Sequence, residues 1–189
     1  MVDKKVRGAF VSGAFNFAKA RYSADQCQCI QDQMSADLRT GLPQIKPNEW
    51  YPLHFATDML RGIQKMHKDA AEWEVAIREC GVYIGEEAST TFVKLLFSIL
   101  TPQLFAQKFP QFWAKYNSFG DIRSDITGIK DKTFVLELMS DGYDYVHLIG
   151  AGWIEFVFKK LGKQGVVVSS NIPSGQVSAD YIRWETHWQ

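Results

Sequence analysis

The stretch GYDYVHLIGAGWIEFVFKKL, residues 142–161, is apolar on almost every side when it is placed on a helix. Its apolar residues do not gather in one stripe: Val146, Ile149, Trp153 and Val157 share one side, and Leu148, Phe156 and the small residues 150–152 occupy others. A helix without a polar face is buried on more than one side. We therefore expect this helix to lie between a sheet and either the N-terminal helices or a second subunit.

The segments before and after this helix have the period of two that is typical of strands. Before it, the alternating residues are Ile122, Ser124 and Ile126 and then, after the turn-like TGIKDK, Phe134, Leu136 and Leu138. After it, residues 165–170 and 176–185 are predicted to be two further strands, joined through NIPSG. The order strand, strand, helix, strand, strand predicts a four-stranded antiparallel sheet covered by the helix at 142–161.

The first two thirds of the chain have the apolar spacing of helices. We predict helices at 6–20, 23–37, 51–68, 72–100 and 103–117, with Ser23 as a cap, bends at Gly81 and Gly85, and a kink or break at Pro110. The predicted fold class is α+β, with N-terminal helices packed with the four-stranded antiparallel sheet. We expect one domain over 1–189, with a helical part at 1–117 and a sheet plus helix part at 118–189.

Charge and cysteine content restrict the possible function classes. The 21 basic and 21 acidic residues cancel, which is not the pattern of a protein that binds nucleic acid. The longest apolar stretch is too short for a transmembrane segment, and the first residues lack the apolar core of a secretory signal. Cys27, Cys29 and Cys80 show no CxxC spacing, so we expect reduced thiols and a cytoplasmic location.

Short motifs of known enzyme classes are missing from the sequence. It contains no P-loop, GxGxxG, HExxH, GxSxG or EF-hand sequence. This favours a non-enzymatic protein, with no catalytic and no metal-binding residues, over a conventional enzyme.

Two of the histidines belong to the helix predicted at 51–68. His54 shares the polar row of Asp58, Arg61 and Lys65, which predicts a solvent-exposed side chain able to pair with Asp58. His67 falls on the apolar side near the end of the helix, where it can face the negative end of the helix dipole. Structural roles are the preferred interpretation of both.

His147 lies in the apolar helix. Burial lowers the pKa of a histidine unless a carboxylate, here Glu155 or Asp144, compensates. No nucleophile or second histidine has a readable spacing to it, so a hydrogen-bonded core histidine is preferred over a catalytic base or a ligand. His187 is close to the end of the sequence and gives no information.

Five strings, spread over nearly the whole chain, carry a resemblance to known proteins. They are RYSADQ (21–26), WYPL (50–53), FAQKFPQFWAKYNSFG (105–120), GAGWIEFVF (150–158) and YIRWE (181–185). They resemble an uncharacterised bacterial family that is abundant in deltaproteobacteria. That family is in turn similar to the 4-vinyl reductase domain, the haem nitric-oxide-binding domain and subunits of the TRAPP vesicle-tethering complex. The resemblance implies the ligand-binding α+β fold of the NO-signalling and Golgi-transport superfamily, whose members hold haem, small aromatic molecules or an acyl chain between helices and sheet.

The chain departs from two patterns of that superfamily. Haem-binding members carry a Tyr-x-Ser-x-Arg motif and an axial histidine, whereas here Tyr22 and Ser23 are followed by alanine and no other such motif occurs. The 4-vinyl reductase pattern has cysteines near its last hairpin, whereas the segment around Gly175 has none. These departures disfavour haem and cysteine-based cofactor chemistry.

The aromatic content is the strongest remaining signal. Thirteen Phe, seven Tyr and six Trp are more than a core of this size usually requires. Together with the resemblance, they lead to the hypothesis of a non-enzymatic sensor or carrier domain that binds a small hydrophobic ligand, such as a fatty acid, between helices and sheet. The predicted ligand-binding residues are Phe55, Met59, Phe92, Leu96, Trp113, Tyr116, Tyr145, His147 and Trp153.

Two alternatives stay open. A TRAPP-like interaction module would form a homodimer, or bind a protein partner, through the helix at 142–161. A haem or metal sensor would use His147, and this is the weaker alternative.

Overall fold

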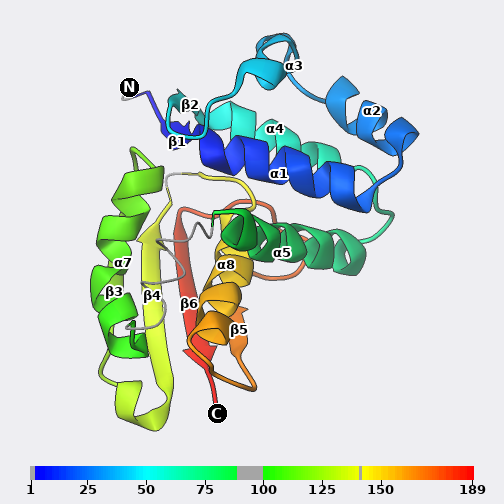
Figure 1. Cartoon of the computed structure of the whole chain (residues 1–189). Coiled ribbons are helices and arrows are strands. Elements are labelled where there is room, and N and C mark those ends of the chain that lie inside the picture. The colour runs from blue at the N-terminus through cyan, green and yellow to red at the C-terminus, as the bar shows by residue number, and fades with distance from the viewer. Residues whose placement is uncertain (1–2, 89–99, 141) are drawn as a thin grey trace.

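The computed structural model describes residues 3–88, 100–140 and 142–189. The N-terminal helices form a layer at one end of the molecule, and the larger sheet lies at the other end with two helices packed beside it (Figure 1). The helices are α1 (Gly8–Arg21), α2 (Ala24–Asp32), α3 (Ala36–Gly41), α4 (Leu53–Gln64), α5 (Ala70–Glu87), α7 (Pro102–Tyr116) and α8 (Val146–Lys160). The strands are β1 (Lys5–Arg7), β2 (Trp50–Pro52), β3 (Asp121–Asp125), β4 (Thr133–Met139), β5 (Val167–Ser170) and β6 (Tyr181–His187). Short 3-10 turns occupy Leu42–Gln44 and Ile129–Asp131.

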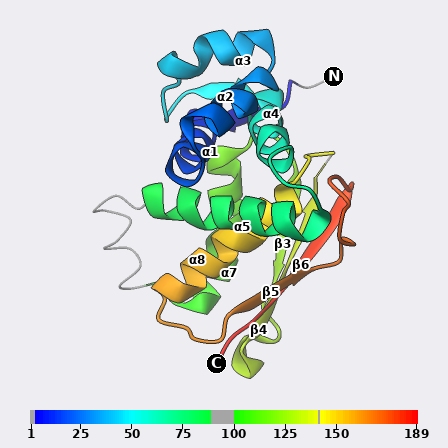
Figure 2. The ribbon, with the colours of Figure 1, turned by 90° about the vertical axis from the view of Figure 1, so that its right-hand side faces the viewer.

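The larger sheet has the strand order β3-β4-β6-β5, and all neighbouring strands are antiparallel. Every second side chain of β4 and β6 is buried, which is the alternation expected of a sheet with one covered face. The ring of Phe134 in β4 contacts Phe105 of α7 and Phe158 of α8, so both helices cover the same face (Figure 2). The predicted α+β class and four-stranded antiparallel sheet are confirmed.

α8 lies between the sheet and α5, as the apolar sequence of residues 142–161 predicts. α5 and α8 approach so closely that a β-carbon added to Gly81 or to Gly152 would overlap a backbone carbonyl of the other helix. α5 runs unbroken through both of its glycines, so the predicted bends at Gly81 and Gly85 are wrong. The glycines are required because the contact between the helices leaves no room for side chains.

The apolar sides of α8 are thus covered within the chain, and nine of its residues are buried. The helix can therefore be stable without a second subunit. A homodimer or partner contact through α8 remains a prediction.

WYPL does not begin a helix. Its first three residues form β2, which pairs antiparallel with β1 and sets Tyr51 opposite Val6. α4 then begins at Leu53 and ends at Gln64, so the predicted helix 51–68 started too early and ended too late. This two-stranded sheet brings the start of the chain beside α4.

The predicted helix 23–37 is divided into α2 and α3. Ser23 caps α2 as predicted: its Oγ accepts from the Gln26 N–H at 3.3 Å, and Gln26 Oε1 accepts from the Ser23 N–H at 3.0 Å. At the division, the Ser35 N–H donates to the Asp58 carboxylate at 3.0 Å instead of to a helical carbonyl. The helix therefore ends, and α3 starts in a new direction.

Pro110 lies inside α7 without breaking it, so of the predicted kink or break the break is wrong, and the kink stays a prediction. A proline cannot donate to the carbonyl four residues earlier, which here belongs to Ala106. Ser124 of β3 donates its hydroxyl to that carbonyl at 2.6 Å. The sheet thus replaces the hydrogen bond that the proline removes.

The remaining predictions are that Phe92 and Leu96 bind the ligand and that the chain has no transmembrane segment. Phe92 and Leu96 lie outside the described residues. Of the helices in the described ranges, none is both long and apolar enough to cross a membrane.

Candidate functional site

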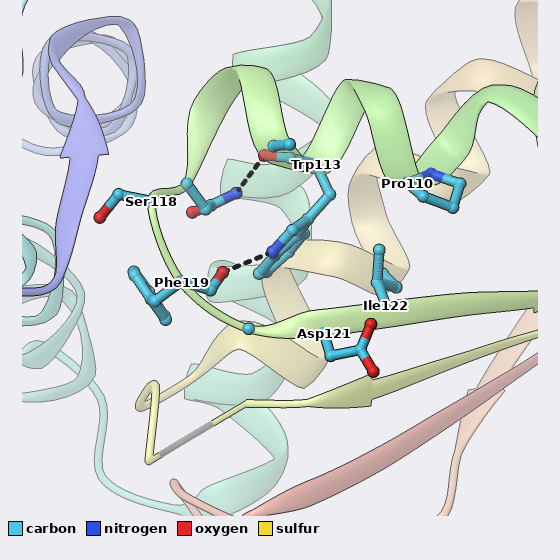
Figure 3. Close-up of a pocket in the computed structure, with 9 residues that line it drawn as sticks. Pro110, Trp113, Ser118, Phe119, Asp121 and Ile122 are labelled. Atoms are coloured by element: carbon cyan, nitrogen blue, oxygen red, sulfur yellow. Dashed lines mark hydrogen bonds between the residues drawn. The ribbon is translucent and has the colours of Figure 1, made fainter. Parts of the chain in front are cut away.

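A depression of about 400 Å³ opens beside the end of α7 (Figure 3). Its lining comes from one continuous stretch of chain, namely α7, the link after it and the start of β3: Pro110, Trp113, Ala114, Asn117, Ser118, Phe119, Gly120, Asp121 and Ile122. The Trp113 indole N–H donates to the Phe119 carbonyl at 2.8 Å, and the Asn117 amide donates to the Trp113 carbonyl at 3.3 Å. Both bonds fix the link against the helix.

The lining of the depression combines apolar and polar surface. Because the indole N–H of Trp113 already has a partner, the ring offers apolar surface, beside Pro110 and Ile122. Ser118 and the exposed carboxylate of Asp121 add polar groups at the rim. Apolar surface with a few converging polar groups is typical of ligand pockets.

The depression lies where the N-terminal strand meets the sheet part. The Ser118 N–H donates to the Lys5 carbonyl at 2.9 Å, and the Lys5 N–H donates to the Ser118 hydroxyl at the same distance. Val6 forms an isolated antiparallel bridge with Asn117, and Arg7 Nε donates to the Lys115 carbonyl at 3.0 Å. The link that lines the depression is thus bonded to β1.

A second unusual region is the segment 142–147, which consists of a turn and the first two residues of α8. Tyr145 has a left-handed backbone, with φ of 63°, although it is a bulky residue. The Tyr143 hydroxyl and His147 Nδ1 are buried and have no hydrogen-bond partner among the described residues. Backbone strain and unpaired buried polar atoms concentrate at functional sites.

Burial shifts the pKa values of this turn. It raises the pKa of the Tyr143 hydroxyl, with a smaller contribution from the Cys80 thiol, so the phenol stays protonated. It lowers the pKa of His147 to about 4, and the Glu74 carboxylate offsets only part of the effect. His147 is therefore neutral at pH 7, and the compensating carboxylate is Glu74, not Glu155 or Asp144 as predicted.

Contacts from several elements hold the turn. The Tyr145 hydroxyl donates to Gln64 Oε1 of α4 at 2.8 Å, and its backbone N–H donates to the Val177 carbonyl at 2.6 Å. The Trp184 indole of β6 donates to the His147 carbonyl at 2.7 Å. These bonds explain how the strained backbone of Tyr145 is maintained.

The space between α7, α8 and the sheet is filled by a cluster of aromatic rings around Phe105. Its ring contacts five others, with centroid distances of 5.4 to 6.4 Å: Phe109, Phe112, Phe134, Trp153 and Phe158. Phe105 itself is only 1% exposed. Most of the aromatic excess noted in the sequence is thus used for packing.

The predicted ligand-binding residues do not meet in one cavity of the described structure. Trp113 lines the depression, Trp153 belongs to the ring cluster around Phe105, and Tyr145 and His147 belong to the turn. The others are the buried Phe55 and Met59 of α4 and the half-buried Tyr116 at the end of α7. Their role as ligand-binding residues remains a prediction.

Sequence reasoning missed most of the lining around Trp113, and it also missed Tyr143. The usable signal was the string NSFG, in which Gly120 takes φ of 82° and turns the chain into β3. Tyr143 was assigned to the apolar helix, so its place before α8 was not anticipated.

The other histidines have surface or structural positions. His54 is exposed as predicted, but it pairs with Asp37 at 3.0 Å, while Asp58 is buried and binds Ser35. His67 Nε2 hydrogen-bonds the Tyr22 hydroxyl at 2.8 Å. In the described ranges, no group of three or more His, Cys, Asp or Glu side chains could hold a metal ion.

The arrangement of helices and sheet defines the class of fold: it is the fold of H-NOX proteins, which the sequence resemblance described as haem nitric-oxide-binding domains. The chain matches an H-NOX protein from S. oneidensis in the Fe(II)NO ligation state with a TM-score of 0.70 and 9% identity, covering 97% of this chain and 99% of that one. For an Fe(II) unliganded H-NOX protein from K. algicida the TM-score is 0.71, with 7% identity and coverage of 97% and 96%.

An oxygen-binding H-NOX domain related to soluble guanylate cyclases matches with a TM-score of 0.62, 12% identity and coverage of 97% and 95%. No protein-family model and no curated protein sequence matches the chain. At these identities the likeness establishes the fold, and the other relationships implied by the resemblance stay predictions.

Proposed function

We propose that this chain is a ligand-binding sensor domain, not an enzyme, and that its ligand is a small, partly apolar molecule bound beside Trp113. The observation that carries the proposal is the position of the depression at the link between α7 and β3, the link to which β1 is bonded. A sensor must convert binding into a shift between two arrangements of the protein. A ligand at this junction would stabilise one arrangement of the helical part relative to the sheet part.

The lining supports a short ligand with one or two polar groups. Trp113, Pro110 and Ile122 supply apolar surface, whereas Ser118 and Asp121 supply hydrogen-bonding groups. The volume of about 400 Å³ falls within the range of roughly 300 to 1,000 Å³ that small-molecule pockets have. A fatty acid, the ligand suggested by the aromatic content, has less support because the rim of the depression is polar.

Binding can be tested by fluorine NMR on protein labelled with 5-fluorotryptophan, which places a probe on each of the six tryptophans. Indole and oleate are titrated separately, and Trp113→Phe assigns the relevant signal. We expect indole to shift the Trp113 signal in a saturable way and to leave the signal of Trp50, on β2, unchanged.

Two exposed positions of α7 provide a matched pair of variants. Ala114 lines the depression and Gln111 does not, although both lie on the same helix. Ala114→Phe should weaken indole binding at least several-fold by filling the space, and Gln111→Phe should not. The proposal is wrong if neither probe moves the Trp113 signal, or if the two variants behave alike. Saturation by oleate alone would favour the fatty-acid ligand.

A further inference from the structure

The likeness to H-NOX proteins raises the question of haem, which haem-binding members of the superfamily hold through an axial histidine. All four histidines of this sequence lie within the described residues. His54 and His187 are exposed and form ion pairs at the surface. His67 uses Nε2 to hydrogen-bond Tyr22. Only His147 has a buried ring nitrogen without a partner in the described structure.

The His147 side chain is 3% exposed and does not line the depression. The Trp184 indole reaches across from β6 to the carbonyl of His147, and its ring presses against α8. A β-carbon added to Gly150, on the next turn, would lie 2.6 Å from that ring. The indole therefore fills the space between the first turns of α8 and the sheet.

Two further spaces between elements of the described structure are filled by aromatic rings of the chain itself. Phe105 fills the space between α7, α8 and the sheet through its contacts with five rings. Tyr143 seals the space between α1 and the link after α7: its ring centroid lies 6.3 Å from Phe10 and 5.5 Å from Phe119. Protein interiors are packed as densely as organic crystals, so a macrocycle would have to displace these rings.

Two other buried side chains that could ligate iron, Cys80 and Tyr143, would each have to lose a proton first. Cysteine and tyrosine bind haem iron as thiolate and phenolate. Burial raises the pKa of the Cys80 thiol and of the Tyr143 hydroxyl far above their ordinary values, so both hold their protons at neutral pH. The described residues therefore do not fit a haem group.

We infer that this chain is a haem-independent form of the H-NOX fold: its own aromatic side chains, centred on Phe105 and Tyr143, fill the interior, and His147 is a structural residue. This inference rests on the packing of the interior and does not depend on the ligand proposed for the depression. The two can therefore fail separately.

The test uses the full chain produced in cells supplied with a haem precursor, followed by titration of the purified protein with haemin. The pyridine haemochrome assay measures haem content, and the Soret band measures binding. His147→Ala is compared with His67→Ala, and circular dichroism verifies that each variant is folded. Should His147→Ala fail to fold, His147→Gln replaces it.

We expect less than a tenth of an equivalent of haem after purification, and only weak, non-saturating absorbance changes that neither substitution alters. The midpoint of urea unfolding should also stay the same when haemin is present, because a ligand that binds only the folded state would raise it. Stoichiometric haem would overturn the inference. So would a saturable one-to-one Soret band that is lost in His147→Ala and retained in His67→Ala.

Discussion

Replacing His147 by glutamine should make the protein less sensitive to acid. In the folded chain burial lowers the pKa of His147 from 6.5 to about 4, while the unfolded chain retains the ordinary value. At pH values between 4 and 6.5, His147 is protonated in the unfolded state and neutral in the folded state. The stabilising contribution of neutral His147 is therefore complete above pH 6.5 and is lost progressively as the pH falls from 6.5 to about 4.

The size of the effect follows from the pKa difference. Each unit corresponds to about 1.4 kcal/mol, so the full shift corresponds to roughly 3 kcal/mol, most of which is already lost at about pH 4.5. Only 3% of His147 is exposed, so solvent screening removes little of this energy. Glutamine carries no ionisable group and eliminates the contribution.

The measurement is the free energy of unfolding in urea at about pH 7.5 and about pH 4.5, the two sides of the expected transition. The wild type should lose about 2 to 3 kcal/mol more between the two pH values than His147→Gln loses. His187→Gln is the control, since His187 is exposed and should leave the pH dependence close to that of the wild type. Acidification also protonates carboxylates, but it does so in every variant, and only the difference is interpreted. Parallel pH profiles for wild type and His147→Gln would refute the reasoning.

Three further substitutions test the packing. Gly152→Ala should cost several kcal/mol of unfolding free energy, on the order of the largest single-site effects, because its methyl group overlaps the backbone of α5; Gly41→Ala, with open space around the added carbon, should be nearly neutral. Phe105→Ala should cost about 3 to 5 kcal/mol in urea unfolding, and a loss below about 1 would show that the ring cluster is loosely packed. Ser124→Ala should cost about 1 to 3 kcal/mol of unfolding free energy, because it leaves the Ala106 carbonyl without a partner. An unchanged thermal midpoint would mean that water replaces the hydroxyl.

The sheet and its covering helix could be predicted because their patterns are regular over many residues. Residues of β4 such as Phe134 and Leu136 alternate with more exposed neighbours, and this alternation survives in the structure. The helix at 142–161 could be placed between two layers because it has no polar face. Both the sheet and the position of the helix could therefore be predicted without knowledge of contacts between distant residues.

The features that escaped prediction depend on residues far apart in the sequence. A three-residue strand such as β1 or β2 is too short for a visible period. The sequence alone suggests that Gly81 marks a bend, whereas the structure shows that a glycine is needed there because α8 approaches closely. For the candidate site, Trp113 was predicted, but the surface around it exists only because the following link folds back and binds its indole.

The bond from Ser124 to Ala106 has a consequence for the order of folding. Without a partner for that carbonyl, the middle of α7 is weaker as an isolated helix than its length suggests, because Pro110 cannot supply the bond. The helix reaches its full stability only after β3 has docked. α7 and the edge of the sheet are thus expected to form and to melt as one cooperative unit, and amide hydrogen exchange should slow in both segments together.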